Sequence, residues 1–109
     1  MEQIPPFYDF MGPVLRVLGQ SGGAASNRDI VVLVARAMNL SPEQLAVERR
    51  KGGSTTTEVE YRIGWAKSYL KKLGYIVNSA RAEWSLTERG RAAGTIDPRK
   101  LVKKARSRR

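Results

Sequence analysis

The stretch "YRIGWAKSYLKKLGYIVNSARAEWSL", residues 61–86, decides the fold because its periodicity changes halfway. Up to Gly74 the apolar residues recur every three or four positions, as on one face of an α-helix. From Tyr75 to Leu86 apolar and polar residues alternate around the polar stretch 78–81, which predicts a short β-hairpin. A helix followed at once by a hairpin is typical of a winged helix-turn-helix, whose last helix enters the major groove of DNA.

The predicted helix, residues 57–73, has two unlike faces. Gly74 suits its C-terminal end, and Thr57 with Glu60, or Thr55 with Glu58, would cap its start. One stripe is apolar and should be buried: Val59, Ile63, Ala66, Leu70 and Leu73. The opposite face carries Tyr61, Gly64, Trp65, Ser68, Lys71 and Lys72.

Gly64 is unusual on an exposed helix face, because it destabilises a helix by about 1 kcal/mol relative to alanine. A glycine would be useful at this position if nucleic acid approached the helix backbone there. Tyr61, Trp65 and Ser68 would then frame the space left by the missing side chain. Tight packing against another helix is the alternative, and both stay open. Trp65 likewise suits either the edge of the core or a contact with DNA.

The basic residues of this region are candidates for phosphate contacts. Lys67, Lys71 and Lys72 lie on the predicted helix, and Arg62 would reach either a phosphate or an acidic neighbour. Arg81 lies at the hairpin tip, where a wing meets the DNA backbone or minor groove. Tyr69 and Trp84 are expected to be structural. The candidate DNA-binding residues are Thr57, Tyr61, Arg62, Gly64, Trp65, Lys67, Ser68, Lys71, Lys72, Ser79 and Arg81.

Three helices are predicted before this region. The first follows Pro5-Pro6, with a kink or a late start at Gly12-Pro13. Ser26 with Asp29 caps the second, and Ser41-Pro42 opens a short third helix that reaches about Arg49. The segment 49–57 is expected to be a loop.

The fold class is therefore mainly α with a small β-hairpin (α+β), a winged helix-turn-helix. Residues 1–94 would form the DNA-binding domain. Seven of the last eleven residues are Lys or Arg, and few apolar residues there are available for burial, so residues 95–109 are expected to form a mobile basic tail or a linker.

Charge is divided unevenly along the 109 residues. Residues 1–48 hold three Lys/Arg and five Asp/Glu, a net −2, whereas residues 49–109 hold 17 and five, a net +12. Such a split is typical of a polyanion binder, most simply of double-stranded DNA. A solvated basic surface without a ligand is the alternative.

The chain contains no cysteine and no histidine. Disulfides, thiolate zinc sites and the commonest general base are therefore excluded, so we expect neither an enzyme nor a cofactor or metal. The N-terminus lacks the pattern of a secretory signal, and the longest apolar run, residues 30–35, is far shorter than a membrane span. These features favour a cytoplasmic, nucleoid-associated protein.

The stretches "RIGWAKSYLKKLGYIVNSARAEWSLTERG" (62–90), "PVLRVL" (13–18) and "SNRDIVVLVARAMNLSPEQ" (26–44) resemble the N-terminal winged-helix domain of Mrr-type restriction endonucleases. The resemblance spans roughly Pro5 to Gly94. It implies a module that binds duplex DNA, including modified DNA, for a C-terminal nuclease domain or partner chain. No Asp, Glu or Gln lies two residues before a Lys, so the nuclease motif of that family is absent from this sequence. Tyr61 departs from the pattern, which has a small polar residue there.

Two other functions fit the same residues. The domain would serve protein interaction or homodimerisation if Trp65 and Tyr61 were hydrophobic anchors. It would otherwise be a stand-alone transcription regulator that binds DNA. The salt dependence of the affinity distinguishes DNA binding from an aromatic protein interface, because affinity for phosphates falls steeply as the salt concentration rises.

Overall fold

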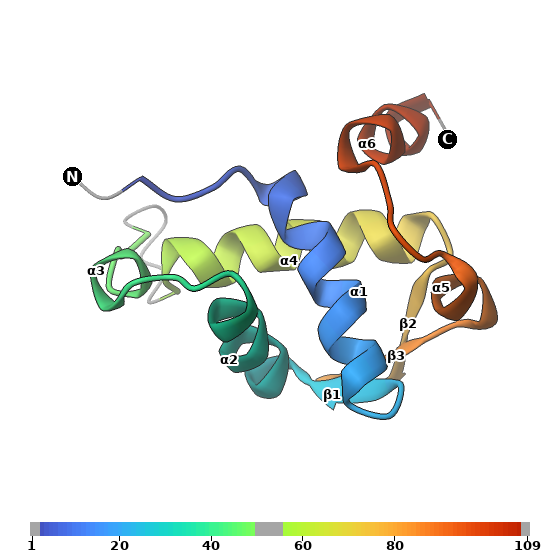
Figure 1. The fold of residues 1–109 in the computed structure, drawn as a ribbon, viewed down its shortest axis with the longest axis horizontal. Coiled ribbons are helices and arrows are strands. Elements are labelled where there is room, and N and C mark those ends of the chain that lie inside the picture. Colours follow the sequence, from blue (N-terminus) through green and yellow to red (C-terminus); the bar gives the residue numbers. More distant parts are fainter. Residues whose placement is uncertain (1–2, 50–55, 108–109) are drawn as a thin grey trace.

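The computed structural model describes residues 3–49 and 56–107, and the order of its elements is that of an α+β winged-helix fold (Figure 1). One short strand lies among the helices of the first part, and a hairpin follows the longest helix. The elements are η1 (Phe7–Phe10), α1 (Met11–Gln20), β1 (Ala24–Ser26), α2 (Asn27–Ala37), α3 (Pro42–Leu45), α4 (Glu58–Lys72), β2 (Ile76–Ala80), β3 (Glu83–Leu86), α5 (Glu88–Ala92) and α6 (Pro98–Ser107).

Side-chain caps set the helix starts at the predicted positions. Ser26 accepts a hydrogen bond from the backbone N–H of Asp29 at the start of α2. Ser41 with Gln44 forms a reciprocal capping box on α3, and Thr57 with Glu60 forms another on α4. These boxes satisfy backbone N–H groups that the first helical turn leaves unpaired. Of the two predicted caps of α4, Thr57 and Thr55, the structure has Thr57.

One helix start agrees with a predicted alternative, and one helix end differs from the prediction. The chain after Pro6 first makes the 3-10 turn η1, and the α-helix starts at Met11, beside Gly12-Pro13, so of the predicted kink and late start the structure has the late start. The third helix ends at Leu45 rather than near Arg49. Residues beyond it pair instead with the chain before α4, through an isolated bridge between Glu48 and Thr57. The predicted loop 49–57 falls largely on residues 50–55, which lie outside the described residues.

The hairpin belongs to a three-stranded antiparallel sheet of order β1-β3-β2. Strand β1 was not predicted. The second strand also extends to Ala80, so the polar stretch expected to be the turn is mostly strand, and the turn itself contains Arg81 and Ala82. The predicted position of Arg81 at the hairpin tip is confirmed.

The core lies where α1, α2 and α4 meet (Figure 1), and the predicted apolar stripe of α4 is buried in it. Helix α6 adds to this core. Val102 is 7% exposed and Ala105 is 0% exposed, and α6 contacts both η1 and α4. The expectation of a tail with little to bury is therefore wrong for Pro98–Ser107, because these two residues lie on one face of a helix whose other faces are basic.

Candidate nucleic-acid interface

The outer face of α4 carries a notch at Gly64. Apart from its chain neighbours and the backbone of its own helix, no described atom would lie within 4 Å of a Cβ at this position, so the glycine faces open space. Tyr61, Gly64, Trp65 and Ser68 line a shallow hollow of about 330 Å³, and Trp65 is 45% exposed. The framing predicted for Gly64 is confirmed, and the alternative of tight helix packing is wrong.

The lysines of α4 differ in their exposure and in their contacts. Lys72 is exposed at the end of the helix, and Lys71 lies with its Nζ 5.9 Å from the ring centre of Trp84. Lys67 is partly buried: its Nζ donates to Oδ1 of Asn27 at 2.8 Å and lies 5.5 Å from the same indole ring. Burial lowers the pKa of the Lys67 ammonium from its ordinary value. This lysine is held between α2 and the hairpin rather than extended into solvent.

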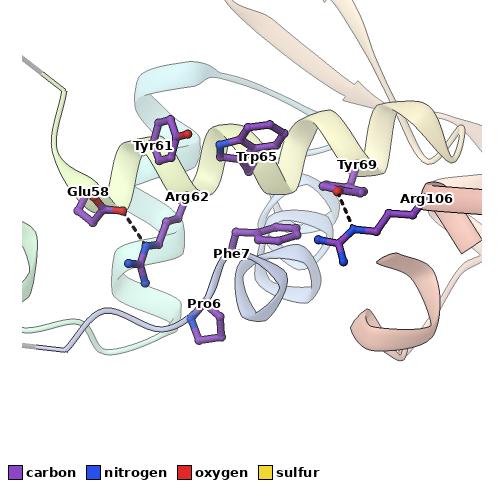
Figure 2. A pocket seen from close by; sticks show the side chains of 8 residues that line it. All are labelled: Pro6, Phe7, Glu58, Tyr61, Arg62, Trp65, Tyr69 and Arg106. Atoms are coloured by element: carbon purple, nitrogen blue, oxygen red, sulfur yellow. Dashed lines mark hydrogen bonds and ion pairs between the residues drawn. The ribbon is translucent and has the colours of Figure 1, made fainter. Parts of the chain in front are cut away.

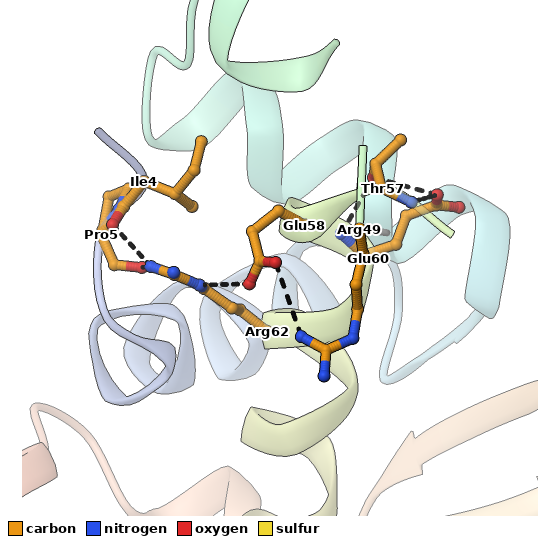
Figure 3. Close-up of polar contacts among 7 residues, drawn as sticks. All are labelled: Ile4, Pro5, Arg49, Thr57, Glu58, Glu60 and Arg62. Atoms are coloured by element: carbon orange, nitrogen blue, oxygen red, sulfur yellow. Dashed lines mark hydrogen bonds and ion pairs between the residues drawn. The ribbon is translucent and has the colours of Figure 1, made fainter. Parts of the chain in front are cut away.

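Arg62 faces the N-terminal segment, as Figure 3 shows. Its Nε donates to Oε2 of Glu58 at 2.8 Å, one helical turn earlier, and its Nη1 donates to the carbonyl oxygens of Ile4 at 2.6 Å and Pro5 at 2.8 Å. Of the two partners foreseen for this side chain, the structure has the acidic neighbour. The guanidinium fixes the chain before η1 against α4.

The other predicted residues divide into bonded and free ones. Thr57 is occupied as the cap of α4, with Oγ1 accepting from the N–H of Glu60 at 3.2 Å. Ser79 donates to a carboxylate oxygen of Glu83 at 3.0 Å. Arg81 is exposed at the turn, and within 3–49 and 56–107 its side chain has no hydrogen-bond or ion-pair partner.

A second hollow, the aromatic groove, lies on the flank of α4 that faces the N-terminal segment and α6 (Figure 2). Its volume is about 480 Å³. Phe7 stacks on Tyr69 with ring centres 5.0 Å apart, and Trp65 lies 6.3 Å from Tyr69. The groove is lined by Pro6, Phe7, Glu58, Tyr61, Arg62, Trp65, Tyr69 and Arg106.

Most of this groove was missed at the level of sequence. The spacing of Tyr61, Trp65 and Tyr69, four residues apart, does predict a row of rings along one side of a helix. The approach of Phe7 and Arg106 depends on chain segments far apart in sequence, and no local pattern indicates it.

Two features are absent from the described part of the chain. No group of three or more acidic side chains there is arranged to hold a metal ion. None of the helices described is both long and apolar enough to cross a bilayer.

The order of helix, strand, three helices and hairpin, with a solvent-facing notched helix beside the hairpin, places the chain in the winged-helix class. Residues 7–95 match the Mrr N-terminal domain, and the chain belongs to that family. It is also 33% identical over 89 residues to the type IV methyl-directed restriction enzyme EcoKMrr of Escherichia coli strain K12. That match covers 80% of this chain but only 28% of the relative's length. No solved structure matches the chain.

Proposed function

We propose that the chain binds double-stranded DNA through the outer face of α4, with the hairpin beside it, as the targeting module of an Mrr-like restriction system. The observation that supports this most is the open notch at Gly64, next to exposed Trp65 and within the strongly basic half of the chain. A helix fits the major groove, and a residue without a side chain lets its backbone approach the base edges.

In this proposal the predicted site residues have two kinds of role. Tyr61, Gly64, Trp65 and Ser68 would face the bases, while Lys71, Lys72 and Arg81 would contact phosphates. The residues that are already bonded would position this surface instead: Thr57 caps α4, Arg62 and Lys67 hold its neighbours, and Ser79 bonds within the hairpin. The exposed cations of α6 would add phosphate contacts without sequence preference.

The same family relationship supports a role in recognising modified DNA in the cytoplasm, since EcoKMrr is named as methyl-directed. Cleavage would come from a nuclease domain or partner chain outside these residues, because the sequence lacks the nuclease motif. Titration with matched unmodified, N6-methyladenine and 5-methylcytosine duplexes at one salt concentration tests the preference for modified bases.

The direct test of DNA binding compares two double variants that remove equal charge. Lys71→Ala/Lys72→Ala alters α4 beside the hairpin, whereas Arg16→Ala/Arg36→Ala removes two exposed cations from α1 and α2. Fluorescence anisotropy with a labelled duplex at low salt should show roughly tenfold or greater loss of DNA affinity for the first variant only. In that variant the slope of log affinity against log salt concentration should be smaller by about two. Equal weakening by both variants would contradict the proposed surface.

A protein interface or homodimer is the second candidate, and the 45% exposure of Trp65 favours it. The affinity of a protein interface anchored by Trp65 would hardly change between low and moderate salt concentrations. Analytical ultracentrifugation of the parent and of Trp65→Ala, at both salt concentrations, separates the two functions. A dimer that survives salt and dissociates in the variant supports the interface.

A further inference from the structure

The aromatic groove combines stacked and tilted rings along one side of α4. Ring centres of Tyr61 and Trp65 are 6.2 Å apart, those of Trp65 and Tyr69 are 6.3 Å apart, and Phe7 approaches Tyr69 from the N-terminal segment (Figure 2). A hollow of about 480 Å³ is large enough for one nucleobase with its sugar. Rows of aromatic rings beside basic residues are the usual platform for unpaired bases.

The groove also has an excess of positive charge. Glu58 is shared by two guanidinium groups, with Arg62 at 2.8 Å and Arg49 at 3.5 Å. At the other end, Arg106 donates to the phenol oxygen of Tyr69 at 3.3 Å, a neutral partner, and within 3–49 and 56–107 no carboxylate pairs with it. The groove is lined by two arginines, Arg62 and Arg106, and one carboxylate, Glu58, which favours an anionic ligand, and Arg106 is the cation left for it.

We propose that the aromatic groove binds one unpaired nucleotide, with its base against Trp65 and the Phe7–Tyr69 pair and its phosphate on Arg106. This inference rests on the proposed function insofar as the ligand is DNA. Tyr61 and Trp65 line both the notch and the groove, so a nucleotide displaced from a duplex on α4 reaches the groove across their rings. An acidic peptide would satisfy the charge but leave the row of rings without planar partners.

The experiment uses three ligands: a fully paired duplex, the same duplex with one unpaired nucleotide, and a polyglutamate peptide of matched charge. Anisotropy would be measured for the whole chain, and the key variant is Arg106→Gln. Lys104→Gln is its matched control, because it removes the same charge from an exposed position of the same helix. Phe7→Leu is the second variant, since it removes a ring but keeps an apolar side chain, and thermal unfolding checks that each variant folds.

The parent should bind the duplex with the unpaired nucleotide at least about fivefold more tightly than the paired one, the lower end of what one base–aromatic stack contributes. Arg106→Gln and Phe7→Leu should lose this preference, while Lys104→Gln keeps it. Affinity of Arg106→Gln for the paired duplex should fall no further than that of Lys104→Gln, because both remove one exposed cation from α6. Equal affinity of the parent for both duplexes, or tighter binding of polyglutamate, would overturn the inference. Binding to paired DNA without the preference leaves the proposed function standing, whereas binding to neither duplex defeats both.

Discussion

The indole Nε1–H of Trp84 donates a hydrogen bond to Oδ1 of Asn27 at 2.8 Å, which ties the hairpin to the first residue of α2. The same oxygen accepts from Lys67 of α4. One amide oxygen of α2 thus joins α4 and the hairpin, which form the proposed interface. The orientation of the hairpin relative to α4 depends on this junction.

Replacing Asn27 with alanine should therefore destabilise the protein by about 1–2 kcal/mol, because two hydrogen bonds lose their acceptor. Chemical denaturation measures the loss. The variant that carries both Asn27→Ala and Trp84→Phe should lose less stability than the sum of the losses of the two single variants, because both changes remove the same hydrogen bond. Strictly additive losses would mean that the bond contributes nothing.

Lys67 should give the protein a pH dependence in the alkaline range. Burial lowers its pKa in the folded state, so the unfolded chain binds more protons between that lowered pKa and the ordinary lysine pKa of about 10.4. Stability of the parent should therefore rise with pH in this window relative to Lys67→Met. The measurement is the free energy of unfolding of both proteins from about pH 8 to pH 10.5. Parallel curves would show that the lysine is not desolvated.

Arg62 should act on stability more than on DNA affinity. Arg62→Ala removes the bonds to Glu58 and to the carbonyls of Ile4 and Pro5, so we expect a loss of about 1–3 kcal/mol and faster proteolysis near the N-terminus. Arg62→Lys should recover only part of it, because an ammonium lacks the planar fork. Arg36→Ala, on the exposed side of α2, is the control and should change neither property. A variant of full stability with weak DNA binding would instead assign Arg62 to the interface.

Gly90 should not tolerate any side chain. A Cβ there would collide with the carbonyl oxygen of Tyr75, at the base of the hairpin. Gly90→Ala should lower stability by about 2–3 kcal/mol, as overpacking of a well-packed site does. Thermal unfolding reports the loss, and a variant as stable as the parent would show that α5 can move away from the hairpin.

Local patterns predicted the parts of the fold that local chemistry controls. The caps at Ser26, Ser41 and Thr57 and the buried stripe of α4 follow from residues within one or two turns of each other. Strand β1 could not be predicted, because three small residues show no alternation and pair only with β3, which lies far along the chain.

Contacts between residues far apart in sequence also explain the other differences between the prediction and the structure. Val102 and Ala105 are the buried residues of α6, and the cations around them hide the pattern. The acidic partner of Arg62 was one of its two predicted partners, but its carbonyl partners lie 57 and 58 residues away in sequence. The notch at Gly64 was predictable because all of its frame lies within two turns of one helix.

The comparison of Gly64→Ala with Gly12→Ala tests the role of the outer face of α4 most directly. Both glycines lie in helices. Within 3–49 and 56–107, a Cβ at either would meet nothing within 4 Å except its chain neighbours and the backbone of its own helix, so both changes should preserve or raise stability, by up to about 1 kcal/mol. If duplex DNA meets the backbone at the notch, Gly64→Ala should weaken binding by about fivefold or more, as one misplaced methyl group does in a close contact, while Gly12→Ala binds like the parent. Unchanged duplex affinity in a stable Gly64→Ala protein would contradict the proposed approach of DNA to α4.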